Sequence, residues 1–217
     1  MFGSRVILIM VDTGSPLPGR MELTEIAVQN GLGKKRANAI AAVLCGALPA
    51  IVLGFWFLPG GWEKVWFFGI TVGLIWGNGF EYVYHRWLLH QPRTLLGVGH
   101  REHHARTGTP DEAEHVALIS SPLNVVLLFV INAVPAFLIA TLVGFREVLS
   151  GIFVGWAAYL IITEEIHWRI HMKEWLPVGL RSARAYHMSH HALPNGRYNV
   201  FFPLFDLLFG SAKRIWS

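Results

Sequence analysis

Four long apolar segments divide this chain, and polar residues gather between them. The segments run over residues 39–58, 65–84, 118–145 and 148–166. Each is long enough to cross a bilayer as a helix, since a crossing needs about 20 apolar residues. Turns of a few residues join the first segment to the second and the third to the fourth, which predicts two helical hairpins. Pro49 lies inside the first segment, where we expect a kink. We expect the third segment to enter the membrane near Pro122, with Pro135 inside it.

The residues ahead of the first apolar segment follow a different pattern. The apolar run from Val6 to Val11 is too short to span a bilayer, so residues 1–20 receive no assignment, and Met21 is an alternative start of the chain. Residues 22–35 predict a short amphipathic helix that ends at the basic cluster 33–36. We therefore expect a cytosolic, partly disordered segment at 1–38 and a single membrane-embedded domain at 39–217.

Ten of the eleven histidines fall into four spaced groups after the second and fourth apolar segments. Each of these segments ends in a histidine pair and is followed by an HxxHH triplet. The pairs are His85 with His90 and His167 with His171, and the triplets are His100, His103, His104 and His187, His190, His191. The repeated order of hairpin, pair and triplet is also consistent with a weak internal duplication, with coincidence as the equal alternative.

Helical geometry predicts how these histidines converge. Positions i, i+3 and i+4 share one helix face, so each triplet is expected to bring its three imidazoles to one ion. His90 lies five residues after His85 and would point about 140° away on a regular helix. Because Pro92 follows, we expect the helix to unwind there and let His90 converge from a frayed turn.

So many imidazoles in one place indicate metal binding. Without a metal they would lack partners, whereas coordination keeps each ring neutral and satisfied. Ten ligands suit two ions better than one, and imidazole alone does not choose between iron, zinc, copper and nickel. His115 lies outside the spacing and is the weakest candidate ligand. The single cysteine, Cys45, lies in an apolar run, so disulfides and thiolate metal sites are excluded.

The distribution of charge sets the orientation. The chain is 53% hydrophobic and only 15% charged, too apolar for an ordinary soluble domain. With the amino end in the cytoplasm, only Lys64 and Arg146 of the 18 Lys and Arg lie outside. We therefore expect a multi-pass protein whose histidines face the cytoplasm, in a bacterial inner membrane rather than the endoplasmic reticulum. The scattered basic residues disfavour nucleic acid as a partner and suit membrane lipids.

Further residues are candidates for supporting the metals or binding a substrate. Glu164 and Glu81 precede ligands by about one helical turn and are expected to accept the outer imidazole N–H, while Asp206 and Asn199 are expected to support ligands or stabilise the last stretch. An apolar substrate would enter from the bilayer between helices. The candidate contacts are Trp76, Phe80, Trp156 and Tyr159 for the chain, and Arg101 and Arg184 for a headgroup. Such aromatic residues are more often packing than pocket, and ordinary positive-inside charge explains the arginines equally well.

The histidine groups occur in recognisable boxes: HRWLLH (85–90), HREHH (100–104), HWRIH (167–171) and HMSHH (187–191). With FEYVYHRWLLH, HHARTGTPDE and YNVFFPLFDLLFG, they resemble the fatty acid hydroxylase/sterol desaturase superfamily over residues 79–210. The five-residue spacing of the first box is most similar to the fatty acid 2-hydroxylase branch. The resemblance implies an all-α membrane fold with a histidine-rich cytosolic cap. It also implies two iron ions that use dioxygen to hydroxylate an unactivated C–H bond of a lipid acyl chain.

The resemblance also bears on the electron donor and leaves alternatives open. Members with their own donor carry a cytochrome b5 domain with an HPGG motif, and here LPGG at 58–61 lacks the histidine. A separate cytochrome b5-like protein or ferredoxin is therefore implied. Alternative enzymes are a carotenoid ring hydroxylase, a sterol desaturase or a sterol methyl oxidase. Outside enzymes, a non-catalytic metal-binding membrane protein, with zinc for example, and a metal transporter remain, although the apolar segments offer little polarity for a transport path besides Asn78 and Asn132.

Overall fold

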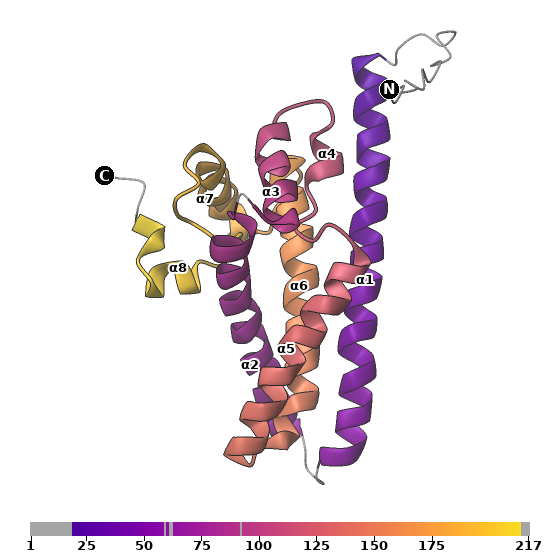
Figure 1. The fold of residues 1–217 in the computed structure, drawn as a ribbon, viewed down its shortest axis with the longest axis vertical. Coiled ribbons are helices and arrows are strands. Elements are labelled where there is room, and N and C mark those ends of the chain that lie inside the picture. Colours follow the sequence, from indigo (N-terminus) through magenta and orange to yellow (C-terminus); the bar gives the residue numbers. More distant parts are fainter. Residues whose placement is uncertain (1–18, 59, 61–62, 92, 214–217) are drawn as a thin grey trace, which may run out of the picture.

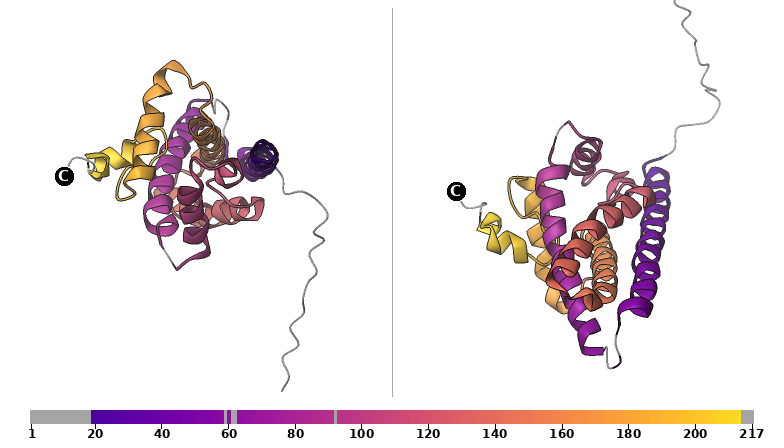
Figure 2. Two further views of the ribbon diagram at one scale, coloured as in Figure 1. Left: turned by 90° about the horizontal axis from the view of Figure 1, so that it is seen from above. Right: turned by 60° about the horizontal axis from the view of Figure 1, so that its bottom comes forward.

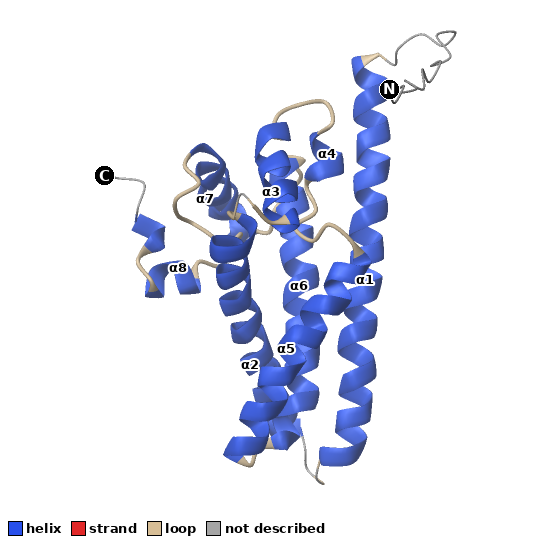
Figure 3. Cartoon of the chain, in the orientation of Figure 1, coloured by secondary structure: helices blue, strands red, loops and turns tan. Residues whose placement is uncertain are grey.

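A bundle of four long helices carries a group of short helices at one end (Figure 1). The computed structural model describes residues 19–58, 60, 63–91 and 93–213, and all regular structure among them is helical (Figure 3). The bundle consists of α1 (Arg20–Phe57), α2 (Glu63–Val83), α5 (Pro122–Val143) and α6 (Leu149–His171). The short helices are α3 (Leu95–Arg106), α4 (Glu112–His115), α7 (Arg181–Ala192) and α8 (Leu204–Leu208). We call α3, α4, α7 and their connecting segments the cap.

Glycine-lined contacts hold α2 against α6 along most of its length. A Cβ atom at Gly73 would lie 2.3 Å from the carbonyl oxygen of Ile152, and one at Gly155 would lie 2.2 Å from that of Ile70. Only glycine permits backbones to approach this closely, which is how helices pack in lipid, where burial of apolar surface gives little gain. The two helices that end in histidine pairs are therefore fixed side by side.

Helix α1 extends well beyond the bundle and holds the cap at its side (Figure 2). The predicted helix end at residues 33–36 is wrong, because α1 runs unbroken from Arg20 through this cluster. The lysines there form contacts that stabilise the continuous helix. Lys34 Nζ donates to the carbonyl oxygen of Glu114 over 3.0 Å, and Lys35 Nζ pairs with Glu165 Oε2 at 2.7 Å. The predicted apolar run at 6–11 lies outside the described residues.

Three of the described helical segments are long and apolar enough to cross a membrane: Arg20–Phe57, Pro122–Val143 and Arg146–His171. Large apolar side chains such as Phe55 and Leu142 point outward from this bundle. Lipid, rather than water, is the solvent that suits such a surface. The chain is therefore an integral membrane protein.

The predicted crossings and the observed helices differ in two places. Helix α2 is not among these three segments, because Asn78 and Glu81 interrupt its apolar sequence and lower its mean hydropathy. The third segment becomes helical at Pro122, where membrane entry was expected, and its residues 118–121 are not helical. There the Ser121 hydroxyl accepts a hydrogen bond from the Asn124 amide over 3.3 Å, and proline suits the first helical position.

Candidate metal centre

All ten boxed histidines meet where the bundle joins the cap, and they form two groups of five. In each group the five candidate ligand nitrogens lie within 4.8 Å of one another. Site 1 contains His85, His90, His100, His104 and His190, and site 2 contains His103, His167, His171, His187 and His191. The two sites are adjacent, since the rings of His104 and His191 stack with centroids 4.2 Å apart.

Each HxxHH triplet is divided between the two sites. In α3, His100 and His104 belong to site 1 and His103 belongs to site 2, whereas in α7 the assignment is reversed and only His190 belongs to site 1. The prediction that one triplet serves one ion is therefore wrong. At about 100° per residue, i and i+4 lie about 40° apart while i+3 lies on the other side of i, so a helix placed between two sites supplies both. Each half of the chain thus contributes one ligand to the other half's site.

A π-helix brings His90 beside His85. Helix α2 continues into the π-helical segment Tyr84–Leu89, and the His90 amide donates to the carbonyl oxygen of His85, five residues back, over 3.3 Å. This wider turn places residues i and i+5 on the same face. The two imidazoles stack with centroids 5.1 Å apart. His90 therefore converges through a regular local structure and not, as expected, through a frayed turn; Pro92 lies outside the described residues.

The Nε2 atoms within each site are spaced as ligands of one ion would be. With metal–nitrogen bonds of about 2.1 Å, neighbouring ligands at right angles lie about 3.0 Å apart. In site 1, His100 Nε2 lies 3.0 Å from His85 Nε2, 3.2 Å from His90 Nε2 and 3.0 Å from His104 Nε2. In site 2, His187 Nε2 lies 3.0 Å from that of His167, and 3.1 Å from those of His171 and His191.

At three of the ten rings, a hydrogen bond on the outer side fixes which nitrogen carries the proton. His190 Nδ1 donates to the carbonyl oxygen of Gly196 over 2.7 Å, and His171 Nδ1 donates to Glu112 Oε1 over 2.8 Å. His85 Nδ1 likewise donates to the carbonyl oxygen of Tyr198. Because these oxygens only accept, each Nε2 is unprotonated and directs its lone pair into the site. Inward lone pairs of this kind, in sites whose Nε2 atoms lie about 3 Å apart, are the donor set that a metal ion binds, so the residues fit a metal.

Burial keeps the cap imidazoles neutral. Burial first, and neighbouring imidazoles second, lower the pKa of His104 to about 4 and the pKa of His190 to about 3. The pKa of His103 also lies well below the ordinary value, chiefly through burial. Neutral imidazole is the form that binds metals. At neutral pH the ligands are therefore ready to bind without first losing a proton.

Comparison with known families agrees with this arrangement. Residues 70–211, well over half of the chain, match the family model described as fatty acid hydroxylase. The chain belongs to the fatty acid hydroxylase family. This membership suggests an oxidoreductase. Comparisons with curated proteins and with solved structures gave no match.

In this hydroxylase family member, the two predicted supporting carboxylates contact backbone and side-chain donors instead of histidines. Glu164 Oε1 accepts from the Ile119 amide over 3.1 Å, in the segment that leads into α5. Glu81 Oε2 accepts from the Tyr159 hydroxyl and from Asn199 Nδ2, both over 2.7 Å. The expected contacts to imidazole N–H groups are therefore absent among the described residues, because the Ile119 amide, Tyr159 and Asn199 donate to these carboxylates instead.

The carboxylate that does contact a ligand is Glu112, which the sequence analysis missed. It follows the HHARTGTPD stretch and reaches His171 from α4, 59 residues away along the chain. Helix α4 in turn lies against α1, because a Cβ atom at Gly31 would be only 2.2 Å from the carbonyl oxygen of Ala113. No local spacing could have shown this contact; the acidic PDE sequence between two boxes was the only signal.

Asp206 and Asn199 support the sites through the backbone of the last stretch. Asp206 is fully buried and accepts from the amides of Tyr198 over 3.0 Å and Asn199 over 2.7 Å. Asn199 Nδ2 also donates to the carbonyl oxygen of Asn78 over 2.9 Å. These bonds hold the Tyr198 carbonyl that accepts from His85. Both residues therefore act on site 1 indirectly.

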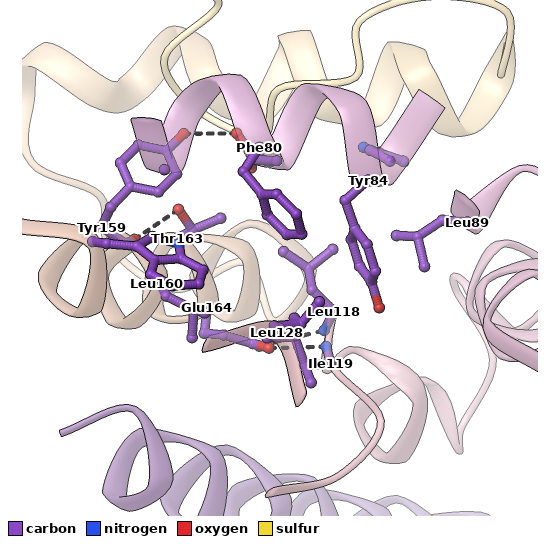
Figure 4. Close-up of a pocket in the computed structure, with 14 residues that line it drawn as sticks. Phe80, Tyr84, Leu89, Leu118, Ile119, Leu128, Tyr159, Leu160, Thr163 and Glu164 are labelled. Carbon is purple, nitrogen blue, oxygen red and sulfur yellow. Dashed lines mark hydrogen bonds between the residues drawn. The ribbon is translucent and has the colours of Figure 1, made fainter. Parts of the chain in front are cut away.

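An apolar cavity between α2, α5 and α6 ends at site 1 (Figure 4). His85 belongs both to the cavity wall and to site 1. Three of the predicted substrate contacts line the cavity: Phe80, Trp156 and Tyr159. Phe80 and Tyr84 stack there with ring centroids 5.7 Å apart. An apolar chain in this cavity would point toward the metal ligands.

The other predicted contacts lie elsewhere. Trp76 Nε1 donates to Asn132 Oδ1 over 3.0 Å, between α2 and α5. Arg184 donates to the carbonyl oxygen of Arg169 over 3.1 Å and so holds the connection from α6 to α7. Arg101 lies exposed on α3, away from the cavity wall. His115 belongs to neither site, and its Nδ1 lies 3.9 Å from a carboxylate oxygen of Glu102.

Proposed function

We propose that this family member is a membrane-bound di-iron oxygenase that hydroxylates an unactivated C–H bond of a lipid acyl chain. The observation that supports this most strongly is the position of His85, which is part of a five-histidine site and also part of an apolar cavity wall. Two iron ions held by sites 1 and 2 would supply the activation of dioxygen. Iron is proposed because of the family, since imidazole ligands serve iron and zinc alike.

The protein's own part in this reaction is to position the substrate and to exclude water. Phe80, Leu128 and Trp156 give the cavity an apolar wall in which a methylene chain replaces no hydrogen bond. The Tyr159 hydroxyl, a polar group of the same wall, donates to Glu81 Oε2 and accepts from Asn78 Nδ2. A chain held in one orientation needs little further ordering before reaction, which is a large part of what an enzyme contributes.

We further propose that α2 is a fourth crossing and that the cap faces the cytoplasm. The glycine contacts along α6 support the crossing, and the distribution of Lys and Arg supports the orientation. Electrons would come from a separate protein, either cytochrome b5-like or a ferredoxin. We place the protein in a bacterial inner membrane, with lipid as both substrate and surroundings.

The proposal is tested by turnover in lipid bilayers. Iron-loaded protein is supplied with reductant, dioxygen and acyl lipids, and the products are analysed by mass spectrometry. A gain of one oxygen atom indicates hydroxylation, and the fragment masses give the acyl chain and the position. A loss of two hydrogens indicates a desaturase instead, and oxygen-independent metal binding without any product indicates a non-catalytic protein.

Two ligand variants and one control connect this reaction to the sites. His104→Ala removes a site 1 ligand and His191→Ala a site 2 ligand, and both variants are expected to abolish product. His115→Ala removes an imidazole outside both sites and is expected to leave turnover within about twofold. Ordinary turnover by both ligand variants contradicts the assignment.

A further inference from the structure

Helix α8 has an apolar outer face that no described part of the chain covers. Leu207 is 60% exposed, Leu208 67% and Phe209 60%, and Phe202 just before the helix is also exposed. Leaving adjacent leucine and phenylalanine side chains in contact with water costs free energy in proportion to the apolar area that they expose. A face of this kind on an ordered helix indicates a partner.

The inner face of α8 is firmly attached to the rest of the molecule. The ring of Phe205 would lie 2.7 Å from a Cβ atom at Gly79, so it occupies space that only glycine leaves on α2. One side of the Phe209 ring stacks on Tyr82, with centroids 5.2 Å apart, while the rest of the ring is exposed on the outer face. Asp206 is fully buried and accepts from Ser211 Oγ over 2.6 Å and the Tyr186 hydroxyl over 2.9 Å. The outer face is therefore presented in a fixed direction.

The position of α8 favours the bilayer as its partner. The helix lies beside the end of α2, at the level where the bundle meets the cap (Figures 1 and 2). Close to it, Trp87 is half-exposed and the Arg86 guanidinium lies 5.2 Å from the Trp87 ring centroid. Tryptophan and arginine are typical of the boundary between headgroups and acyl chains. The α8 surface thus continues the lipid-facing surface of the bundle.

A second copy of the chain is a weaker candidate partner. A stable interface buries about 800 Å² on each partner. The four exposed side chains of the outer face offer less than that, because a side chain of this size presents at most about 150–250 Å² and each of the four is exposed only in part. The surface is large enough for shallow insertion into lipid, which needs no minimum area.

We propose that α8 inserts at the headgroup–acyl boundary of the bilayer and thereby keeps site 1 assembled. Two hydrogen bonds in series connect α8 to site 1. Asp206 of α8 accepts from the Tyr198 amide, and the Tyr198 carbonyl accepts from His85 Nδ1. Lipid contact on the outer face of α8 is in this way transmitted to a site 1 ligand. Among the hydrogen bonds of the described residues, none joins a site 2 histidine to α8.

The first experiment measures the depth of α8 in lipid. A Leu208→Cys variant in a Cys45→Ala background carries a fluorescent label, and the full-length protein is placed in vesicles whose lipids bear a quencher near the headgroup or deep in the acyl chain. Matched labels at Ser182→Cys, exposed on α7, and Ile131→Cys, exposed at the middle of α5, mark the aqueous and deep limits.

The outcome decides the location of α8. We expect the shallow quencher to reduce the signal at position 208 at least threefold more than at 182, and the deep quencher to act most strongly at 131. Quenching at 208 equal to that at 182 overturns the proposal. Protection from both quenchers together with 208–208 crosslinking points to a second copy and also overturns it.

The second experiment tests the connection to site 1 without any turnover. A Leu207→Gln, Leu208→Gln double variant loses the apolar face, and Leu207→Met, Leu208→Met keeps it. Each protein is loaded with cobalt(II) in bilayers and then exposed to a chelator. We expect the glutamine variant to fall from two bound ions to about one, and the methionine variant to keep two. Asp206→Asn, which weakens the inner connection, should resemble the glutamine variant.

Two results contradict the coupling. One is retention of two cobalt ions by the glutamine variant, and the other is loss of both ions at the same rate. Helical circular dichroism of each variant identifies general unfolding, and in that case the depth measurement at position 208 still decides the location of α8. Since cobalt is bound irrespective of oxygenase chemistry, failure here is distinguishable from failure of the proposed reaction.

Discussion

Sites 1 and 2 use the same ligand type but differ in what supports them. Site 1 adjoins the apolar cavity, and His85 and His190 donate to backbone carbonyls of the segment after α7. Site 2 has two ligands on α6, and His171 donates to the carboxylate of Glu112. A carboxylate makes an imidazole a stronger ligand than a neutral carbonyl does. We therefore expect site 2 to bind its ion more tightly and site 1 to be the one that responds to its surroundings.

Removing the central ligand of each site should have the largest effect. His100 has three site 1 neighbours at its Nε2, and His187 has three in site 2. We expect His100→Ala to lose only the site 1 ion and His187→Ala only the site 2 ion, each giving about one metal per protein by elemental analysis. If either variant loses both ions, the two groups act as one site and the comparison fails.

The carboxylate of Glu112 provides the next largest effect. We expect Glu112→Gln to weaken site 2 by about 10–100-fold in a chelator competition, because His171 loses its charged partner. Glu114→Gln on the same helix is the matched control, since Glu114 contacts Lys34 and no ligand. Equal affinities in both variants would mean that carbonyl and carboxylate support are equivalent.

Substitutions at two glycines of α1 distinguish the packing of α1 against the cap from the intrinsic helix propensity of α1. Gly31→Ala places a methyl group against the Ala113 backbone and should cost about 1–3 kcal/mol of unfolding free energy. Gly33→Ala meets nothing within 4 Å and should stabilise the helix by up to about 1 kcal/mol. Thermal unfolding of the metal-loaded protein measures both. Changes of the same sign would show that α1 does not hold α4 in place.

The smallest effects should distinguish two tryptophans. Trp76→Phe loses one hydrogen bond to Asn132 and should cost about 1 kcal/mol of stability while leaving KM unchanged. Trp156→Phe alters the cavity wall and should raise KM for an acyl lipid several-fold. The reverse result, with KM changed only by Trp76→Phe, would place the substrate outside the cavity.

The sequence predicted what depends on local periodicity. The long apolar segments, the four histidine boxes and the metal-binding character of the ten imidazoles all follow from the spacing of residues within single segments of the chain. The membership of the superfamily follows from the same boxes. These features need no knowledge of which helices become neighbours.

The features that the sequence did not reveal depend on which helices become neighbours in the fold. The division of the triplets follows from α3 and α7 lying between two sites, and the partners of Glu81 and Glu164 come from segments distant in the chain. The contact of Glu112 with His171 spans 59 residues. Helix α1 continues past Gly33 because its lysines find acidic partners in α4 and α6, which outweighs the local signal for a helix end.

The exchange of His103 and His190 has a consequence for how the protein matures. Residues up to α4 provide four nitrogens for one ion and a single nitrogen for the other, and the remainder of the chain provides the complement. Neither half supplies all five ligands of either site alone. Metal loading therefore adds ligand bonds between the two halves, which already pack through α2 and α6, and chelation should make the connection between α4 and α5 more accessible to a protease.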